Sequence, residues 1–134
     1  MALNFHYHQN ADVLYIAVNS PVPAVSYELD TEETMLRVSE PTGDLVGWTL
    51  VGLTEYDHHL PLRLDRSKPD WFNRNDPHLL IRYDQRADQL RAFLDARKIF
   101  TIDHLSENDH FVDAGEIEEI ISAGNQGQKI ERYA

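Results

Sequence analysis

The feature that most constrains the fold is a polar turn leading into an apolar run, which the chain contains twice. The first occurrence is Tyr7–Ile16, in which Asn10 and Asp12 can hydrogen-bond the backbone of their own turn. The second follows 76 positions later, where Tyr83, Ala87, Asp88 and Leu90 match Tyr7, Ala11, Asp12 and Leu14. A recurrence at a fixed offset predicts an internal repeat.

Apolar and polar side chains alternate in the first half, which predicts antiparallel strands. Leu3, Phe5 and Tyr7 alternate with polar residues, as in a strand with one buried face. Residues 13–18 are apolar throughout, which predicts a central strand covered on both faces, with Tyr15 buried. Three further strands are predicted over residues 25–30, 35–39 and 45–51.

Two glycines and a tryptophan have expected roles in this half. Gly43 lies in the predicted turn 41–44, where its residue type is favoured. Gly47 lies inside a predicted strand, which indicates a bulge or the close approach of another backbone. Trp48 is expected in the core rather than as a platform for a ligand.

The second half fits more than one interpretation. Residues 84–98 fit one face of a helix, but the repeat favours strands. Residues 116–124 fit a strand and a short helix ended by Gly124 equally well. Ser122–Gln128 is predicted to correspond to the turn at 39–44, at a larger offset, so the second copy is expected to carry a few inserted residues within Leu105–Gly115.

The predicted fold is mainly β, with α+β as the alternative. It consists of two repeated antiparallel β-meander units related by a pseudo-twofold axis. Residues 1–54 form the first unit and residues 79–134 the second, divergent unit, which packs on the first as one compact unit. Residues 55–78 form a proline-rich connector, with a short helical turn possible from Thr54 and with Trp71–Phe72 docked on the core.

The two copies are expected to differ in exposure. Tyr15, expected to be buried, corresponds to Arg91, so one face of the second strand should be wet. Apolar residues also interleave with the acidic run Asp103–Glu119 and could be buried against a partner. The predicted partner surface therefore comprises Arg91, Phe111, Val112, Ile117 and Ile120.

The charge balance limits the partners that the chain can have. With 12 Lys and Arg against 23 Asp and Glu, the formal net charge is −11, which argues against nucleic acid and anionic membranes and favours a basic protein. The charges are segregated, because five cations from Arg82 to Lys98 precede seven acids in Asp103–Glu119. The absence of cysteine excludes thiol chemistry and fits a cytoplasmic protein. No stretch resembles a secretory signal or a cofactor loop, so no cofactor is expected.

The motif of the first half resembles a known bacterial family. A tyrosine, a few turn residues, Ala-Asp-x-Leu-Tyr-Ile and a later Gly-Asp turn into Leu-Val-Gly are similar to the family called domain of unknown function 2283, over residues 3–53. The matching residues are Tyr7, Ala11, Asp12, Leu14, Tyr15, Ile16, Gly43, Asp44, Val46 and Gly47. The resemblance implies a small β-rich domain without established activity or site residues, sometimes suspected of being the acidic half of a toxin–antitoxin-like pair.

Histidines are the most chemical feature of this chain. His6 and His8 lie two apart, and therefore on one face of the predicted strand, while Asp57, His58 and His59 lie in the connector. Imidazoles and carboxylates could together hold a metal ion, although the spacing meets ligand geometry only loosely. Solvent-facing imidazoles are the simpler interpretation of His6 and His8.

Asp12 and Asp88 are the candidates for acid–base or nucleophilic chemistry. An aspartate that bonds the backbone amides of its own turn is usually structural, and the sequence has no phosphate loop, nucleophile elbow or zinc-protease helix. The sequence therefore predicts a noncatalytic β-rich module that acts by protein association, including homodimerisation through sheet edges. An antitoxin-like partner of a small basic protein and a His/Asp metal-binding protein or hydrolase are the alternatives.

Overall fold

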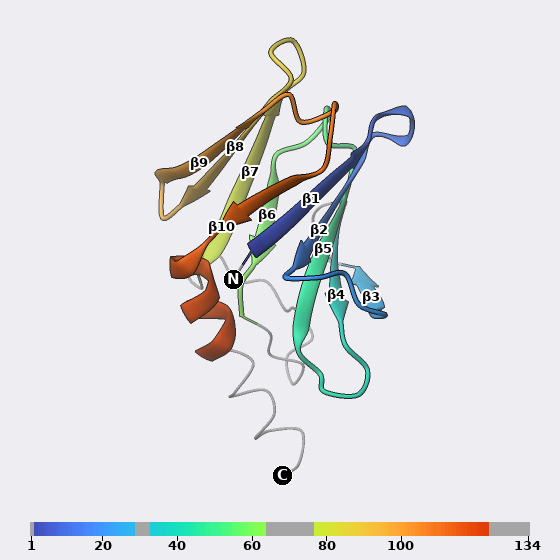
Figure 1. Ribbon diagram of the computed structural model, residues 1–134, viewed down its shortest axis with the longest axis vertical. Helices are drawn as coiled ribbons and strands as arrows, with labels where there is room; N and C mark the ends of the chain where they lie inside the picture. Colours follow the sequence, from blue (N-terminus) through green and yellow to red (C-terminus); the bar gives the residue numbers. More distant parts are fainter. Residues whose placement is uncertain (1, 29–32, 64–76, 124–134) are drawn as a thin grey trace.

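Two antiparallel sheets dominate the computed structural model, which describes residues 2–28, 33–63 and 77–123 (Figure 1). The six-stranded sheet has the order β10–β1–β2–β5–β4–β3, with strands β1 (Ala2–His8), β2 (Val13–Val18), β3 (Val25–Glu28), β4 (Thr34–Val38), β5 (Leu45–Val51) and β10 (His110–Asp113). The four-stranded sheet has the order β6–β7–β8–β9, with strands β6 (His58–Pro61), β7 (His78–Asp84), β8 (Gln89–Leu94) and β9 (Arg97–Asp103). The mainly β prediction is confirmed.

The strands form because alternate side chains are apolar and are buried in one hydrophobic core, to which both sheets contribute. In β1, Leu3, Phe5 and Tyr7 are buried and the residues between them are not. Trp48 of β5 is fully buried, and its Nε1 donates a hydrogen bond to the Pro61 carbonyl oxygen of β6 at 3.0 Å. Trp48 is thus a core residue, as predicted, and links the two sheets. Leu14, Ile16 and Leu90 are also buried.

One edge strand of each sheet follows, in the sequence, a strand of the other sheet. β6 comes after β5 but pairs with β7, with Leu60 opposite Leu79. β10 comes after β9 but pairs with β1, with Val112 opposite Leu3. The loop that leaves each sheet therefore crosses to the other, which ties the two sheets together.

Both turn and strand glycines have the predicted roles. A Cβ atom on Gly47 would lie 2.4 Å from the Ile16 carbonyl oxygen on the neighbouring β2, so the backbones approach too closely for a side chain. Gly43 has a φ of 74° and its N–H donates to the Ser39 carbonyl oxygen at 2.7 Å. Only glycine adopts this left-handed turn conformation without strain.

The prediction that β2 is covered on both faces is wrong. Tyr15 is 39 % exposed, and its ring stacks on His6 with 6.2 Å between centroids. The outer face of β2 therefore lies outside the core, and Arg91 on β8 is likewise exposed. The expected contrast between a buried Tyr15 and a wet Arg91 is absent, because both side chains stand on outer sheet faces.

The connector prediction is partly wrong. Strand β6 lies within residues 55–78, because Leu60 enters the core while its neighbours pair with β7. Residues 53–55 form a turn rather than a helix. Trp71–Phe72 lies outside the described residues, as does most of Ser122–Gln128.

The open alternatives in the second half are settled by packing. Residues 84–98 contribute to strands, as the repeat predicted, whereas residues 115–123 are helical. Ile117 and Ile121, four positions apart, are buried and Ile120 is half-buried, so one helical face joins the core. Gly124 lies outside the described residues.

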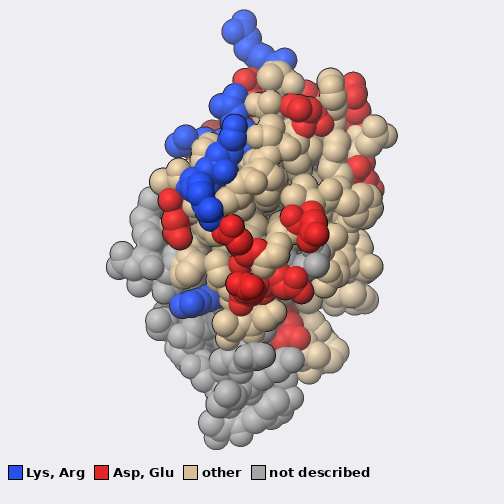
Figure 2. Space-filling view, turned by 60° about the vertical axis from the view of Figure 1, so that its left-hand side comes forward, with Lys and Arg blue, Asp and Glu red and all other residues tan. Residues whose placement is uncertain are grey.

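The surface charge is segregated, as the sequence suggested. Lys and Arg side chains gather in a stripe on the side of the molecule formed by the four-stranded sheet, with acidic side chains beside it (Figure 2). Within the described ranges, no helix combines the length and apolarity needed to cross a membrane.

Candidate functional site

Asp12 lies at the centre of a polar cluster with Tyr7 and Thr54, called here the Asp12 cluster. The Tyr7 hydroxyl donates to Asp12 Oδ1 at 2.6 Å, and the Thr54 hydroxyl donates to Asp12 Oδ2 at 2.7 Å. The Thr54 backbone N–H lies 3.2 Å from both carboxylate oxygens. The carboxylate therefore fixes the end of β1 to the turn that follows β5.

The local backbone presents Asp12 for this role. A single 3-10 turn, Gln9–Ala11, ends at Asp12, which adopts the left-handed conformation with φ of 55°. The Asp12 N–H donates to the Gln9 carbonyl oxygen at 3.1 Å, and the Gly52 N–H donates to the Asp12 carbonyl oxygen at 2.9 Å. Aspartate tolerates this conformation better than most residues because its short side chain bonds locally. Ala11 is an exposed residue of the same turn.

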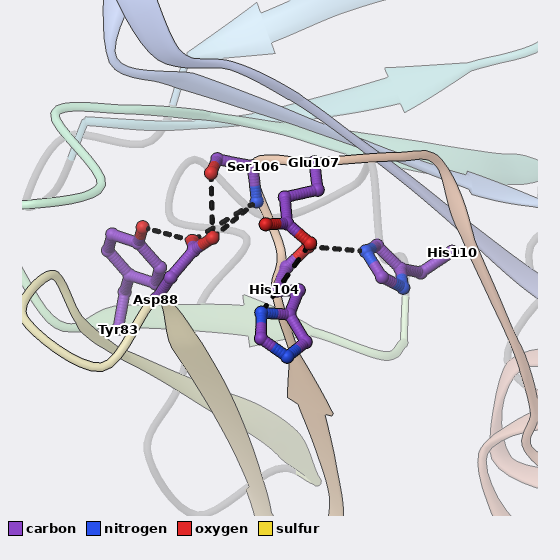
Figure 3. Close-up of polar contacts among 6 residues, drawn as sticks. All are labelled: Tyr83, Asp88, His104, Ser106, Glu107 and His110. Atoms are coloured by element: carbon purple, nitrogen blue, oxygen red, sulfur yellow. Dashed lines mark hydrogen bonds and ion pairs between the residues drawn. The ribbon is translucent and has the colours of Figure 1, made fainter.

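The same contacts recur around Asp88 with Tyr83 and Ser106, called here the Asp88 cluster (Figure 3). The Tyr83 hydroxyl donates to Asp88 Oδ1 and the Ser106 hydroxyl to Asp88 Oδ2, both at 2.6 Å. The Ser106 N–H lies 3.1 and 3.2 Å from the two oxygens, and Asp88 has φ of 50°. Both clusters thus hold a carboxylate by a tyrosine, a hydroxyl and one backbone amide.

The spacing within the two clusters corrects the predicted insertion. Thr54 follows Asp12 by 42 positions, whereas Ser106 follows Asp88 by only 18. The difference arises because β3 and β4 lie between β2 and β5, while β8 leads directly into β9. The second half is therefore shorter between these positions, and no insertion within Leu105–Gly115 is needed.

The two clusters touch each other at their tyrosines. The rings of Tyr7 and Tyr83 lie with centroids 5.4 Å apart and are inclined at 60°. Two further polar contacts each join one half to the other: Arg82 Nε lies 3.1 Å from Asp57 Oδ2, and His6 Nδ1 lies 2.6 Å from Asp109 Oδ1. Arg82 and Asp109 follow His6 and Asp57 by the same 76 and 52 positions that relate the clusters.

Hydrogen bonding sets the ionisation of both aspartates. Desolvation alone would raise the pKa of Asp12, but the hydrogen bonds from Tyr7 and Thr54 outweigh it and lower this pKa. Desolvation opposes the hydrogen bonds from Ser106 and Tyr83 at Asp88 in the same way, and the pKa of Asp88 is also lowered. Burial, followed by the hydrogen bond to the carboxylate, raises the pKa of each tyrosine. Both clusters thus favour an ionised aspartate and a neutral tyrosine.

This arrangement is poorly suited to nucleophilic catalysis. Ser106 donates its hydroxyl proton to Asp88, whose lowered pKa makes it a weak general base. The nearby imidazoles are engaged elsewhere, since His104 Nδ1 lies 3.5 Å from Glu107 Oε2 and His110 Nε2 lies 2.9 Å from the His104 carbonyl oxygen (Figure 3). The geometry suits a carboxylate that joins two turns better than one that attacks a substrate. The predicted contact differs from the observed one, because the carboxylates bond the amides of Thr54 and Ser106 rather than amides of their own turns.

The predicted metal ligands are not brought together. His58 is fully buried with Nδ1 2.6 Å from Thr34 Oγ1, whereas the His59 ring packs near that of His78 at 5.3 Å. Asp57 pairs with Arg82, as described above, and His6 and His8 are exposed on β1. In the described part of the chain, no group of three or more potential ligands is placed to hold a metal ion.

The residues of the predicted partner surface differ in exposure. Phe111 is 72 % exposed on β10 and Arg91 is exposed on β8, while Val112 and Ile120 are half-buried. Ile117 is fully buried within the chain, so its inclusion in this surface is wrong. It enters the core because the segment is helical and turns Ile117 inward with Ile121.

Thr54 and Ser106 complete the clusters but were not predicted from the sequence. A signal for them exists: residues 53–58 read Leu-Thr-Glu-Tyr-Asp-His and residues 105–110 read Leu-Ser-Glu-Asn-Asp-His. Their offset is 52 rather than 76, so a search at one fixed spacing misses them. Comparisons of the chain with family models, curated proteins and solved structures give no match.

Proposed function

We propose that the chain is a noncatalytic β-rich module that acts by protein association, and that two copies associate through the edge strand β10. The observation that carries this proposal is Phe111, a large aromatic side chain 72 % exposed on that strand. Isolated exposed apolar residues are common, but an aromatic residue on a sheet edge is a frequent anchor for association.

The comparison of β10 with β6 supports the choice of edge. His59 lies 52 positions before Phe111 and occupies the matching place on β6, where it is half-buried near His78. β6 also ends in Pro61, which has no N–H to donate to an added strand. Of these two matching edge strands, β10 is therefore the more apolar, and it has intact backbone donors.

A second copy of the chain is the partner that fits this edge. Antiparallel pairing of β10 with itself, about a twofold axis perpendicular to the sheet, places Phe111 of one copy beside Phe111 of the other. Each Phe111 then loses contact with water, and each sheet gains backbone hydrogen bonds. Nonpolar burial at the centre of such an interface would be the main source of affinity.

Sedimentation velocity over a range of protein concentrations tests the proposal. The natural chain should form dimers, and Phe111→Ser should weaken dimerisation by at least about tenfold, as expected for an aromatic anchor. Val22→Ser is the matched control, because Val22 is 44 % exposed but lies between β2 and β3, away from β10. A natural chain that stays monomeric, or an equal loss with Val22→Ser, would refute pairing through β10.

We infer further that the two halves arose by duplication of one unit. This inference is supported by matching registers: Phe5 opposite Ile16 and Ile81 opposite Ala92 differ by 76 positions throughout. The exchange of β6 and β10 between sheets is what a fused, strand-swapped dimer would retain. The resemblance to the family called domain of unknown function 2283 belongs to the first half and implies no activity.

A further inference from the structure

The outer face of the four-stranded sheet carries a group of cations around one aromatic ring. This group, called here the basic patch, comprises Arg82, Arg91, Phe93 and Lys98. In β8, Leu90, Ala92 and Leu94 point into the core, so Arg91 and Phe93 between them stand on the outer face. Arg82 is exposed on β7 and Lys98 on β9.

The strand register brings these side chains together. Arg82 lies directly opposite Arg91, and Phe93 lies opposite Lys98 on its other side. The Arg82 Cζ atom lies 5.7 Å from the centroid of the Phe93 ring, within reach of a cation–π contact. Leu80, half-buried and opposite Phe93, extends the apolar centre of the patch.

The positive charge of the patch is only partly neutralised inside the chain. Arg82 has Asp57 as an ion-pair partner, whereas Arg91 Nε donates to the neutral Gln89 side chain at 2.8 Å. Lys98 forms no ion pair with any residue of the described ranges. Two cations opposite each other repel, so a bound anion would relieve an unfavourable contact as well as add a favourable one. Lys and Arg side chains form a stripe, drawn in blue, on the side of the molecule that carries the four-stranded sheet (Figure 2).

Over the described residues, the matching outer face of the six-stranded sheet has no such pair of facing cations. His6 opposite Tyr15 stands where Arg82 opposite Arg91 stands, and Ala17 takes the place of Phe93. Folding of the strand pair therefore does not require these cations or the aromatic ring. They are an addition to one face only.

We propose that the basic patch binds a short acidic peptide segment, with its carboxylates on Arg82, Arg91 and Lys98 and an apolar side chain against Phe93. Guanidinium groups match carboxylates in charge and in planar, bidentate geometry. Phe93 with Leu80 supplies the apolar contact that a free anion would not use. This surface is separate from β10, so it does not depend on the proposed dimer.

Charge favours a peptide over nucleic acid. Nucleic acid gains affinity from many phosphate contacts spread along a basic surface, but this chain has a net charge of −11 and only three cations in the patch. Acidic residues also border the patch: Asp84 and Asp103 end β7 and β9, and Asp57, directly before β6, pairs with Arg82. A short segment can meet the cations without running onto this acidic surround.

Fluorescence anisotropy tests the proposal with a fluorescein-labelled peptide, Gly-Glu-Phe-Glu-Leu-Glu-Gly. The natural chain should bind it saturably, and Arg91→Glu should weaken binding by at least about fivefold, because attraction is replaced by repulsion. Phe93→Ala should also weaken binding, whereas a peptide with Gln in place of Glu should bind far less.

The matched control is Arg37→Glu, which makes the same charge change on β4 of the other sheet and should alter affinity by less than about twofold. Measuring in the Phe111→Ser background separates the patch from self-association, and circular dichroism checks that each variant is folded. Absence of saturable binding, or equal losses for Arg37→Glu and Arg91→Glu, would overturn the proposal. Tighter binding of an equally charged thymidine oligonucleotide would overturn it in favour of nucleic acid.

Discussion

The Asp12 and Asp88 clusters are alike, while the outer faces of the strands beside them differ. Each cluster joins a tyrosine, an aspartate and a hydroxyl residue at matching distances. Outside, His6 opposite Tyr15 on one sheet contrasts with Arg82 opposite Arg91 on the other. The cluster contacts are thus shared by both halves, whereas the side chains on the outer faces differ in charge.

The largest effect is expected from removing either carboxylate. Asp12→Ala and Asp88→Ala should each lower the free energy of unfolding by about 2 kcal/mol or more, because a tyrosine, a hydroxyl and an amide lose their acceptor and alanine is strained at positive φ. Urea titration at neutral pH measures both losses. A large loss for one variant and none for the other would break the equivalence of the clusters.

The residues before the two hydroxyls offer a second contrast. Gly52 and His104 match in position, with φ of 72° and 57°. Gly52→Ala should cost about 1–2 kcal/mol, because the new Cβ atom is strained and lies 3.0 Å from the Tyr56 ring. His104→Gly should change stability by less than about 0.5 kcal/mol, since relief of strain offsets the greater freedom of glycine in the unfolded chain. Thermal melts measure the stability of both variants. A Gly52→Ala protein more stable than the natural chain would contradict the expected strain at this turn.

Acid should destabilise the protein through both clusters. The folded chain lowers the pKa of Asp12 and Asp88 below the ordinary value of 3.8, so their stabilisation is present above that pH and is lost as the pH falls through the folded-state values. Urea midpoints measured from neutral pH to acid should therefore fall. Asp12→Asn and Asp88→Asn should each flatten this fall, and an unchanged profile in both would argue against ionised carboxylates in the clusters.

The smallest effect is expected from exchanging the hydroxyl residues. Thr54→Ser and Ser106→Thr keep the hydroxyl and amide donors, so each should change the free energy of unfolding by less than about 0.5 kcal/mol. Thr54→Val and Ser106→Ala are the matched controls that remove the hydroxyl, and each should cost more than its exchange. Equal losses for exchange and removal would show that side-chain shape, rather than the hydroxyl, matters at these positions.

Local patterns predicted the elements but not how they are paired. Alternation in residues 3–7 and the apolar run at 13–18 gave β1 and β2, because side-chain periodicity reports which face is buried. The pairing of β6 with β7 depends on contacts between residues distant in sequence. The residues of β6 were therefore predicted to belong to a connector. Tyr15 was predicted to be buried because it lies in an apolar run. Such a run does not show whether another layer covers the outer face of the strand.

The candidate sites, like the fold, could be predicted only in part from the sequence. Asp12 and Asp88 were recognised by their common turn, but Thr54 and Ser106 follow at unequal distances, since β3 and β4 separate only the first pair. Ile117 was placed on the surface because its neighbours are acidic, yet the helix turns it inward. The grouping of Arg82 with Arg91 required the strand register.

One crossed measurement separates the structural role of the clusters from the partner binding proposed for the outer face. Asp88→Asn and Arg91→Glu are compared for urea midpoint and for affinity toward the acidic peptide, under conditions where both are folded. We expect Asp88→Asn to lose stability but keep its affinity, and Arg91→Glu to keep stability but lose affinity. A folded Asp88→Asn protein that no longer binds the peptide would contradict this separation, because the cluster would then belong to the binding site.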